Sequence, residues 1–269
     1  MSFERYGRFV DSFVKITQIL PRPRNVIGTS VIELQQVEST NNYATALVHA
    51  GLAQAGTVVW THAQTKGKGQ RHKSWEAAPG ENITASYLIE PYGLPLSAAF
   101  AISRAVAVGA HRFFSRHAGD QTKVKWPNDL FWQDRKAGGI LIENVIGGAD
   151  WRWAVAGLGI NINQVAFGGI ANEAVSLRQI TGRAWDLRAL LDELSACLRD
   201  SLDQLADDPA SVAAAYDALL YKRGEAVRLR KGSRVFEAEI RGVTEDGRLI
   251  AWHGTEELFQ VGEVEWVRE

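Results

Sequence analysis

Short apolar runs and longer periodic stretches follow one another along most of the chain. Runs rich in β-branched residues predict strands, and apolar residues that recur every three or four positions predict helices. The predicted strands cover residues 31–34, 57–60, 83–89, 124–126, 138–144 and 151–160, the last two joined by a turn at 147–150. The predicted helices cover 39–52 and 95–116, and two more begin after the capping residues Asp186 and Asp208.

The pattern changes after Gly224. Four short strands of alternating polarity are predicted at 226–229, 235–240, 249–252 and 264–267, with turns at 231–233 and 245–247. Short strands joined by tight turns predict a small antiparallel barrel or sandwich. The expected organisation is an N-terminal extension of unknown role over 1–23, a main domain over 24–222 and a small C-terminal barrel over 223–269.

Composition excludes several classes of protein. The 30 lysines and arginines nearly balance the 31 aspartates and glutamates, so a broad basic surface for nucleic acid or anionic membrane is not expected. The longest apolar stretch, 94–114, is interrupted by Arg104 and His111 and is too short to span a bilayer. The single Cys197 lies in a leucine-rich helical pattern, which predicts a buried structural thiol, and no secretory signal is expected, so we predict a cytoplasmic protein.

A local excess of charge stands out against this balance. Residues 62–75, between two predicted strands, contain four basic side chains and no acidic one. The four are Lys66, Lys68, Arg71 and Lys73. Gly67 and Gly69 allow backbone amides to face an anion, although a solvated flexible loop fits the same residues. The glycine spacing of a Walker loop is absent from this segment.

A second unusual segment runs from Lys125 to Asp129, with the sequence Lys-Trp-Pro-Asn-Asp, and is followed by Lys136. The pair Asn128 and Asp129 fits either a simple turn or a ligand contact. Lys136 begins an otherwise apolar strand beside two glycines. A lysine in that position can bring a point charge to a pocket wall and stabilise a developing phosphoryl charge.

The third unusual feature of the sequence is a pair of carboxamide side chains. Alternation along a strand places Asn161 and Asn163 on the same face, where they either tie loops together or bind polar edges of a ligand. The sequence contains no zinc-ligand spacing, no nucleophile elbow and no histidine paired with a nucleophile, and it predicts no metal-ligand set. These features favour an enzyme that positions two substrates and stabilises phosphate charge while one attacks the other.

These segments resemble bacterial biotin protein ligases in their order and spacing. The resemblance rests on residues 39–41, 66–75, 125–129 with Lys136 and 139–141, and 157–161, and extends over about residues 30 to 269. It implies an α/β catalytic domain with a mixed sheet, followed by a small antiparallel β-barrel. Some such ligases carry an N-terminal DNA-binding domain, for which residues 1–23 are too short, so we expect the non-repressor class.

The resemblance also implies an activity. Such ligases join biotin to ATP, giving biotinyl-5′-AMP and pyrophosphate, and pass the biotinyl group to a lysine of a biotin carboxyl carrier domain. ATP and biotin are then substrates, Mg²⁺ is expected, and the partner is the carrier domain of a biotin-dependent carboxylase, with no nucleic acid or membrane partner. The alternatives are a lipoate or octanoate ligase of related chemistry, and a non-catalytic module whose basic loop binds an acidic partner.

The site residues follow from the same resemblance. Charge stabilisation in catalysis is assigned to Lys136, Arg71 and Lys68. Biotin contacts are assigned to Ser39, Thr40, Asn41, Gln64, Lys68, Gly69, Gln70, Lys136 and Gly139. ATP contacts are assigned to Lys125, Asn128, Asp129, Asn161 and Trp75. For Asn128 and Asp129 the alternatives are contacts to magnesium or to the acceptor lysine. Trp185 and the segment 165–174 are expected to order over the adenylate.

The basic loop departs from the family pattern Gly-Arg-Gly-Arg-x-Gly-Arg-x-Trp. Lys68, Gln70 and Lys73 replace the three arginines, and His72 replaces the third glycine. Lysine keeps the charge but loses the planar fork of arginine, Gln70 supplies no charge, and Arg71 is the neighbouring candidate to replace it. A left-handed backbone at His72 would be strained. The C-terminal barrel either stabilises the main domain or closes over ATP, with Gly262-Glu263 matching a late family motif.

Overall fold

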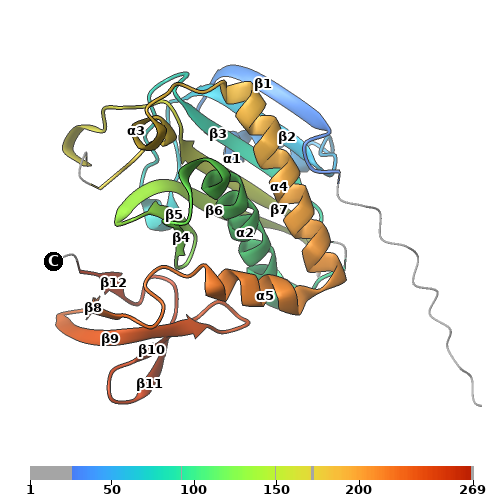
Figure 1. Ribbon diagram of the computed structural model, residues 1–269. Coiled ribbons are helices and arrows are strands. Elements are labelled where there is room, and N and C mark those ends of the chain that lie inside the picture. The colour runs from blue at the N-terminus through green and yellow to red at the C-terminus, as the bar shows by residue number, and fades with distance from the viewer. Residues whose placement is uncertain (1–25, 92, 149, 171–172, 268–269) are drawn as a thin grey trace, which may run out of the picture.

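The computed structural model of the chain describes residues 26–267 apart from positions 92, 149, 171 and 172 (Figure 1). The described residues form two β-sheets, one large and one small, with helices packed on the large one. The predicted extension over 1–23 lies outside the described residues. No helix among the described residues is long and apolar enough to cross a membrane.

The large sheet has seven strands in the order β1-β2-β3-β7-β6-β5-β4. Its strands are β1 (Ser30–Val37), β2 (Thr57–Gln64), β3 (Asn82–Ile89), β4 (Thr122–Lys125), β5 (Asp129–Trp132), β6 (Arg135–Gly147) and β7 (Asp150–Asn161). β1 and β2 pair in parallel and the other neighbours are antiparallel, so the sheet is mixed, as expected. β5 was not predicted, because its first residue is the polar Asp129 that directly follows the turn.

The helices begin where polar side chains cap them. They are α1 (Thr40–His49), α2 (Ala99–Ala118), α3 (Leu177–Thr181), α4 (Leu187–Asp207) and α5 (Pro209–Ala218). Ser39, Asp186 and Asp208 each accept a hydrogen bond from a backbone amide in the first turn of α1, α4 and α5, which confirms these three predicted starts. The short helix α3 was missed, although Ser176 and Gln179 form a capping box before it.

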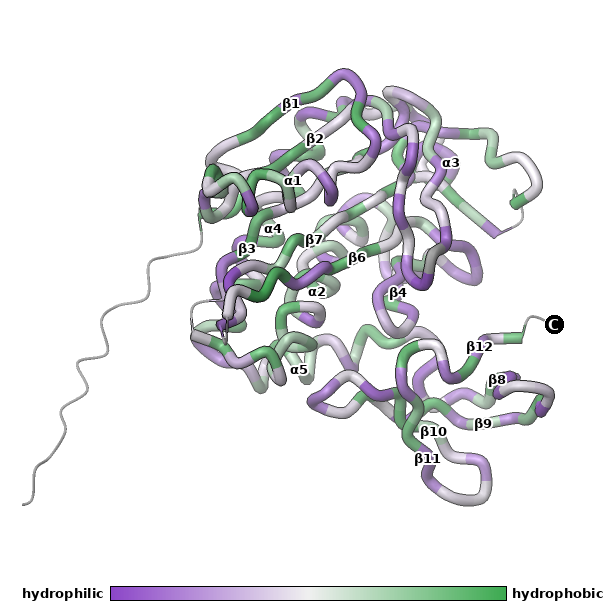
Figure 2. The backbone as a smooth tube through the Cα atoms, turned by 180° about the vertical axis from the view of Figure 1, so that it is seen from behind, coloured by the Kyte–Doolittle hydropathy of each residue, from purple (hydrophilic) through white to green (hydrophobic). Residues whose placement is uncertain are grey.

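Both faces of the large sheet are covered. Val58 belongs to the main core, in which Phe113 of α2 and Leu194 of α4 are also buried, whereas the next residue, Val59, packs in a smaller cluster with Ala44 of α1. Successive strand residues point to opposite faces, so α1 lies opposite α2 and α4. Figure 2 shows hydrophobic stretches running through the strands between these layers. Cys197 is 1% exposed within the main core, which confirms the predicted buried thiol.

The small sheet follows α5 and is antiparallel throughout, in the order β11-β10-β9-β8-β12. Its strands are β8 (Ala226–Lys231), β9 (Arg234–Val243), β10 (Leu249–Trp252), β11 (Glu256–Phe259) and β12 (Glu265–Trp266). The expected fold class, a mixed-sheet α/β domain followed by a small antiparallel unit, is confirmed. β11 was not predicted, because its Glu-Glu start carries little apolar signal.

The turn between β9 and β10 attaches the small sheet to the large one. Arg104 of α2 donates hydrogen bonds to the carbonyls of Val243 and Thr244, at 2.8 and 2.9 Å. The indole N–H of Trp126 donates to the carbonyl of Gly247 at 2.9 Å. Trp126 lies between β4 and β5. The small sheet therefore supports, from one side, the turn that carries the Lys125–Asp129 segment.

Candidate functional site

A cavity of about 440 Å³ lies where the large sheet, the basic segment and the small sheet meet. All the predicted site residues except Asn161 contribute to its lining. These are Ser39, Thr40, Asn41, Gln64, Lys68, Gly69, Gln70, Arg71, Trp75, Lys125, Asn128, Asp129, Lys136 and Gly139. The structure thus brings together side chains that are as much as a hundred residues apart in the sequence.

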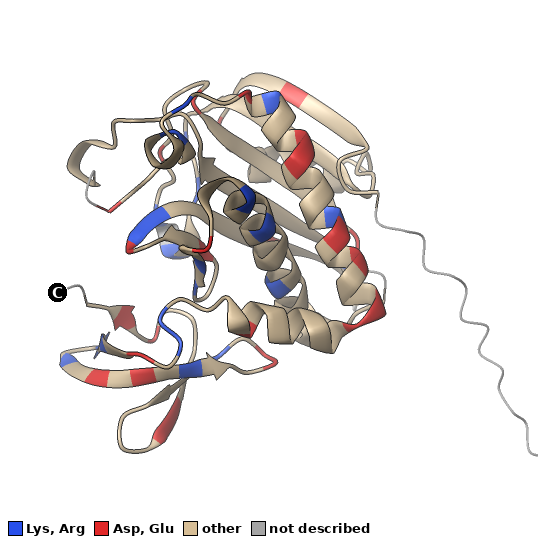
Figure 3. Cartoon of the chain, in the orientation of Figure 1, with Lys and Arg blue, Asp and Glu red and all other residues tan. Residues whose placement is uncertain are grey.

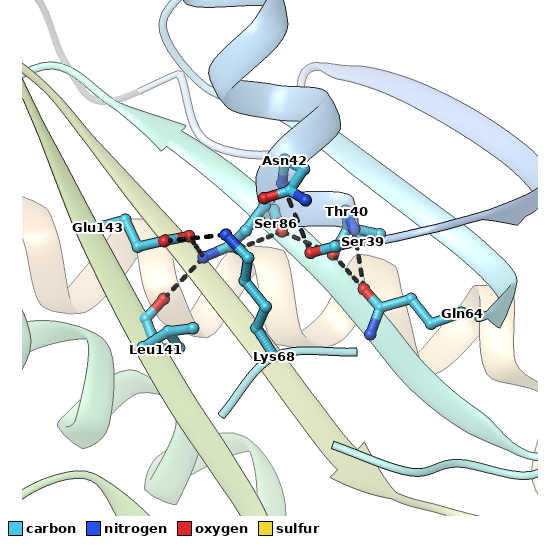
Figure 4. A network of polar contacts seen from close by, with 9 residues as sticks. Ser39, Thr40, Asn42, Gln64, Lys68, Ser86, Leu141 and Glu143 are labelled. Atoms are coloured by element: carbon cyan, nitrogen blue, oxygen red, sulfur yellow. Dashed lines mark hydrogen bonds and ion pairs between the residues drawn. The ribbon is translucent and has the colours of Figure 1, made fainter. Parts of the chain in front are cut away.

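The cavity lining at the start of α1 consists of neutral side chains that form hydrogen bonds with one another. The backbone N–H and the hydroxyl of Thr40 both donate to Oε1 of Gln64, at 2.8 and 3.1 Å (Figure 4). The carboxamide oxygen of Gln64 is therefore committed to Thr40, which leaves its NH₂ group as the donor for a ligand. Ser39 and Thr40 are almost completely buried, so their hydroxyls can be reached only from the cavity.

Asn41 is held on every side. Its Nδ2 donates to Oε2 of Glu143 at 2.7 Å and to the carbonyl of Leu141 at 3.3 Å, and its Oδ1 accepts from the hydroxyl of Ser86 at 2.6 Å. A Cβ atom at Gly157 would come within 2.2 Å of Asn41 Oδ1. With donors and acceptor engaged, Asn41 shapes the wall of the cavity, and the biotin contact assigned to it stays a prediction.

The basic segment is folded into a tight loop rather than left free. Lys68 and Ser74 form an antiparallel bridge, and the N–H of Trp75 donates to the carbonyl of Gly67 at 3.0 Å. Lys66 pairs with Glu38 at 2.7 Å and Lys68 pairs with Glu143 at 3.3 Å. Acidic residues from elsewhere in the sequence therefore offset two of its four positive charges. Elsewhere, α4 and β9 carry charges of both signs, whereas the charged residues of α2 are all basic (Figure 3).

The left-handed backbone in this loop falls on Arg71, with φ 54° and ψ 47°, rather than on His72. The Arg71 side chain reaches the small sheet, because a Cβ atom at Gly262 would lie 2.5 Å from its guanidinium carbon. Gly262 itself has φ +88°. The contact requires a glycine at this point of the small sheet and brings the two units together at the cavity.

The turn that carries Gly262 is fixed by a cluster of charges. Nζ of Lys231 lies 2.6 Å from Glu263 and 2.9 Å from Glu257, and His253 contacts the same Glu257 at 2.7 Å. The hydrogen bond from Lys231 lowers the pKa of both glutamate carboxyls. Both carboxylates remain ionised at neutral pH, and the pair of Glu263 with Lys231 holds the turn against β8.

Trp75 packs directly on the backbone of β7. A Cβ atom at Gly159 would come within 2.3 Å of the indole ring, so the ring occupies the space that a side chain would need. The Nζ atom of Lys136 lies 5.9 Å from the ring centre. The buried indole N–H of Trp75 meets no acceptor among the described residues, which leaves it available to a ligand in the cavity.

Lys136 and Asp129 form an ion pair at the centre of the lining, with Nζ 2.8 Å from Oδ1. Asn128, by contrast, is buried in the turn between β4 and β5 and donates its amide to the carbonyl of Ile140 on β6, which fixes this turn. This contact agrees with the turn interpretation for Asn128. The ion pair gives Lys136 a defined position that still faces the cavity.

Lys125 lies among aromatic rings from both units. Its Nζ is 4.6 Å from the ring centre of Phe131, 4.8 Å from that of Trp266 and 5.7 Å from that of Tyr221. Trp266 belongs to β12 and also lines the cavity. A cation among ring faces is attracted to them, so Lys125 links the main sheet to the small one.

The two carboxamides at the end of β7 tie loops together. Asn161 is 4% exposed and donates to the carbonyl of Val175 at 3.2 Å, outside the cavity lining. Asn163 exchanges hydrogen bonds with the backbone of Trp185, at 2.9 Å in both directions. Of the two alternatives for these residues, the structure supports the loop tie, and it does not bring Asn161 to the other predicted ATP contacts.

Trp185 also lies away from the cavity. Its ring packs against His117, with the centres 4.5 Å apart, and Arg183 lies 3.7 Å from the ring centre. The segment 165–174 is described only in part. Its described end pairs with Lys136, whose backbone N–H donates to the carbonyl of Glu173 at 2.7 Å. The expectation that Trp185 covers an adenylate is not supported in this conformation.

Sequence reasoning missed three residues around the cavity. Ser86 is hidden in the apolar run of β3, and Trp266 carries no motif. Glu143 ends the apolar run that begins at Lys136, and an acid in that position is an unusual feature that could have served as a signal. Each acquires its role from a partner distant in sequence.

Residues 33–161 match the Biotin/lipoate A/B protein ligase family. This range contains every part of the cavity except the residues from the small sheet. Residues 33–161 are a biotin/lipoate protein ligase domain. The resemblance seen in the sequence is therefore confirmed, and the basic loop and the Lys136–Asp129 pair belong to the ligase domain.

Named relatives extend the similarity beyond the ligase domain. The chain is 27% identical over 226 residues to the biotin–[acetyl-CoA-carboxylase] ligase of Paracoccus denitrificans, covering 81% of this chain and 92% of the relative. It is 26% identical over 229 residues to the bifunctional ligase/repressor BirA of Bacillus spizizenii, covering 84% of this chain and 70% of the relative. The biotin protein ligase from Aquifex aeolicus in complex with biotin and ATP superposes with a TM-score of 0.75 at 22% identity, over 89% of this chain and 99% of that one. The last comparison shows that the ligase domain and the small sheet share that fold.

Proposed function

We propose that the chain is an ATP-dependent biotin protein ligase that forms biotinyl-5′-AMP and transfers the biotinyl group to a lysine of a biotin carboxyl carrier protein. One observation carries the proposal: a single cavity of the ligase domain joins a neutral hydrogen-bonding end, at Thr40 and Gln64, to a cationic part around Lys136. Biotin has the matching polarity, with a neutral ureido ring and an anionic carboxylate. The names of the relatives agree with this activity.

The ureido ring would bind at the start of α1. It offers two N–H donors and a carbonyl acceptor, which the hydroxyls of Ser39 and Thr40 and the NH₂ group of Gln64 can satisfy. The dithiolane ring of lipoate offers no such groups, and these buried polar atoms would then stay unpaired on binding. The apolar ring and chain of biotin would lie against Leu141 and Leu158, which line the same cavity.

Lys136 would stabilise the first transition state. An oxygen of the biotin carboxylate attacks the α-phosphorus of ATP, the bond from that phosphorus to the bridging oxygen breaks, and pyrophosphate leaves. Negative charge grows on the phosphoryl oxygens, and a lysine already fixed by Asp129 at 2.8 Å needs little reorganisation to meet it. Lys68 and Arg71, in the loop over the cavity, would add positive charge.

The second step uses the same site. The neutral amine of the acceptor lysine attacks the acyl carbon of biotinyl-5′-AMP, the bond to the phosphate oxygen breaks, and AMP leaves as the nitrogen releases one proton to solvent and the amide forms. No covalent bond to the protein is needed. Catalysis then consists of holding the adenylate in place until the carrier domain arrives.

Mg²⁺ fits the donor set of the cavity. Two carboxylates, Asp129 and Glu265, contribute to the lining, and magnesium at nucleotide sites is usually held by one or two carboxylates together with substrate phosphates. We assign Asp129 as the protein ligand. When bound, the ion would neutralise charge on the phosphates of ATP.

We further propose that the two parts of the chain have different roles. Residues 24–222 would hold biotin and ATP, and residues 223–269 would complete the cavity through Gly262 and Trp266, which line it. The carrier domain of a biotin-dependent carboxylase would be the partner. A cytoplasmic location is consistent with Cys197, a lone cysteine that cannot form a disulfide within the chain.

The test is ATP–pyrophosphate exchange in the presence of Mg²⁺, with biotin, lipoate or octanoate as the acid. Biotin alone should drive exchange, and addition of a candidate carrier domain should then give a biotinylated lysine by mass spectrometry. Exchange driven by lipoate or octanoate would replace the proposal with the related ligase. Salt-dependent binding of an acidic partner without any exchange would indicate a binding module.

A further inference from the structure

Glu143 joins two parts of the cavity although it is not in the cavity lining. It lies on β6, two residues beyond Leu141, and each of its carboxylate oxygens has a different partner (Figure 4). Oε2 accepts from Nδ2 of Asn41 at 2.7 Å, and Oε1 accepts from Nζ of Lys68 at 3.3 Å. One side chain therefore contacts both the start of α1 and the loop above it.

The contact with Asn41 fixes an orientation. An asparagine amide can turn over, and each orientation presents a different atom to its neighbours. A carboxylate accepts hydrogen bonds only, as does the carbonyl of Leu141, so Glu143 and Leu141 together hold the NH₂ end of Asn41 toward β6 and leave its oxygen for Ser86. Ser86 lies 2.7 Å from the hydroxyl of Thr40, which in turn contacts Gln64. Ser86 thus lies between Asn41 and Thr40, which is one of the predicted ureido contacts.

The contact with Lys68 fixes the loop. Among the described residues, two ion pairs join the segment 66–75 to the rest of the chain, Lys66 with Glu38 and Lys68 with Glu143. The first lies at the base of the loop and is largely exposed, with 71% and 61% of the two side chains accessible. The second lies nearer the cavity and is less exposed, at 42% and 37%.

We propose that Glu143 is a positioning residue that holds the basic loop over the cavity through Lys68 and orients the Asn41 amide. An ammonium has three N–H donors, so Lys68 can keep Glu143 and still turn a donor to the carboxylate or phosphate of a substrate. Glu143 touches no reacting atom. Its effect on biotin binding rests on the proposed function, whereas its effect on the loop does not.

The loop can be followed without any substrate, because Arg71 and Lys73 are trypsin cleavage sites. Glu143→Gln keeps an acceptor for Asn41 but removes the charge that attracts Lys68. Partly exposed ion pairs are weak, so cleavage at these two sites in the unliganded full chain is expected to be about two to five times faster than in the wild type. Glu38→Gln, which removes the exposed pair at the base of the same loop, is the matched control and should change cleavage less.

Kinetics separate positioning from chemistry. In Glu143→Gln the KM for biotin in ATP–pyrophosphate exchange should rise by about the same two to five times while kcat changes little, since bound substrate still meets Lys136. Glu143→Ala removes both contacts and should raise that KM further. Melting temperatures of both variants show whether they fold. If Glu143→Ala does not fold, the cleavage and KM measured for Glu143→Gln decide the proposal alone.

A double variant tests whether Glu143 acts on the loop through Lys68. If Glu143 acts on the loop through Lys68, adding Glu143→Gln to Lys68→Met should give no further increase in cleavage at Arg71 and Lys73. Additive effects, or wild-type cleavage in Glu143→Gln, would overturn the proposal. A wild-type chain without biotin-dependent exchange would overturn the proposed function instead, and the cleavage measurement would still decide the role of Glu143.

Discussion

The indole ring of Trp75 lies on the bare backbone of Gly159, in space that any side chain at Gly159 would fill. Trp75 ends the basic loop and Gly159 lies near the end of β7, so this contact sets how closely the loop approaches the sheet. The lining of the cavity on this side is therefore determined by the absence of one Cβ atom.

Gly159→Ala should displace Trp75 and weaken ATP binding. The new Cβ would meet the ring at 2.3 Å, and overpacking of this kind costs about 1–3 kcal/mol. We expect the KM for ATP in pyrophosphate exchange to rise by about tenfold. Gly169→Ala is the control, because a Cβ there has nothing within 4 Å. An unchanged KM in Gly159→Ala would show that Trp75 does not contribute to the nucleotide site.

Lys136→Ala should remove most adenylation activity. Loss of one preorganised group that stabilises developing charge typically lowers kcat by about 10² to 10³ times. Single-turnover formation of biotinyl-5′-AMP measures this step directly. Lys222→Ala, which removes another lysine paired with an aspartate, Asp134, should retain activity, since Lys222 is not in the cavity lining. Wild-type rates in Lys136→Ala would assign Lys136 a structural role.

Gly262→Ala should separate the small sheet from the basic loop. The added Cβ would lie 2.5 Å from the guanidinium of Arg71 and would move that side chain out of the cavity. An increase of about three to ten times in the KM for ATP is expected. Gly254→Ala provides a close control, because Gly254 also has a left-handed φ, +98°, but open space around it. Both variants share the backbone strain, so equal effects would mean that the Arg71 contact is unimportant.

His111 should make folding stability depend on pH. Burial lowers its pKa below 6.5 in the folded chain, against the effect of the hydrogen bond to the carbonyl of Thr122. The unfolded chain therefore binds a proton first as pH falls, and the free energy of unfolding should decrease below pH 6.5, by at most about 1.4 kcal/mol for each pH unit. Urea unfolding between pH 7 and 5 should show a shallower dependence in His111→Gln. The same slope in both proteins would contradict this origin.

Much of the fold was accessible from local patterns. Caps at Ser39 and Asp186 and the apolar runs of β2 and β3 are signals carried by neighbouring residues, and each gave the correct element. β5 and β11 begin with acidic residues, so their pairing with neighbouring strands, rather than their own sequence, makes them strands.

Part of the site could also be predicted from short motifs in the sequence. Motifs brought the right side chains to one cavity, because each motif lies at the end of a strand or helix that the sheet aligns. They did not reveal that Glu143 would engage Asn41 and Lys68, since those contacts span 102 and 75 residues. Asn161 shows a limit of the alternation pattern: β7 ends at Asn161, so the strand does not include Asn163, and the Asn161 amide donates to the loop carbonyl of Val175.

The hydrogen bond from Trp126 to the carbonyl of Gly247 has a consequence for engineering. Through this bond the β9–β10 turn supports the Lys125–Asp129 segment, and Arg104 on α2 holds the same turn by its hydrogen bond to Val243. A chimera that exchanges C-terminal modules between ligases would have to transfer a turn that can accept the hydrogen bonds from Trp126 and Arg104. Residues 244–247 are therefore the segment whose match decides whether such a hybrid keeps its nucleotide site.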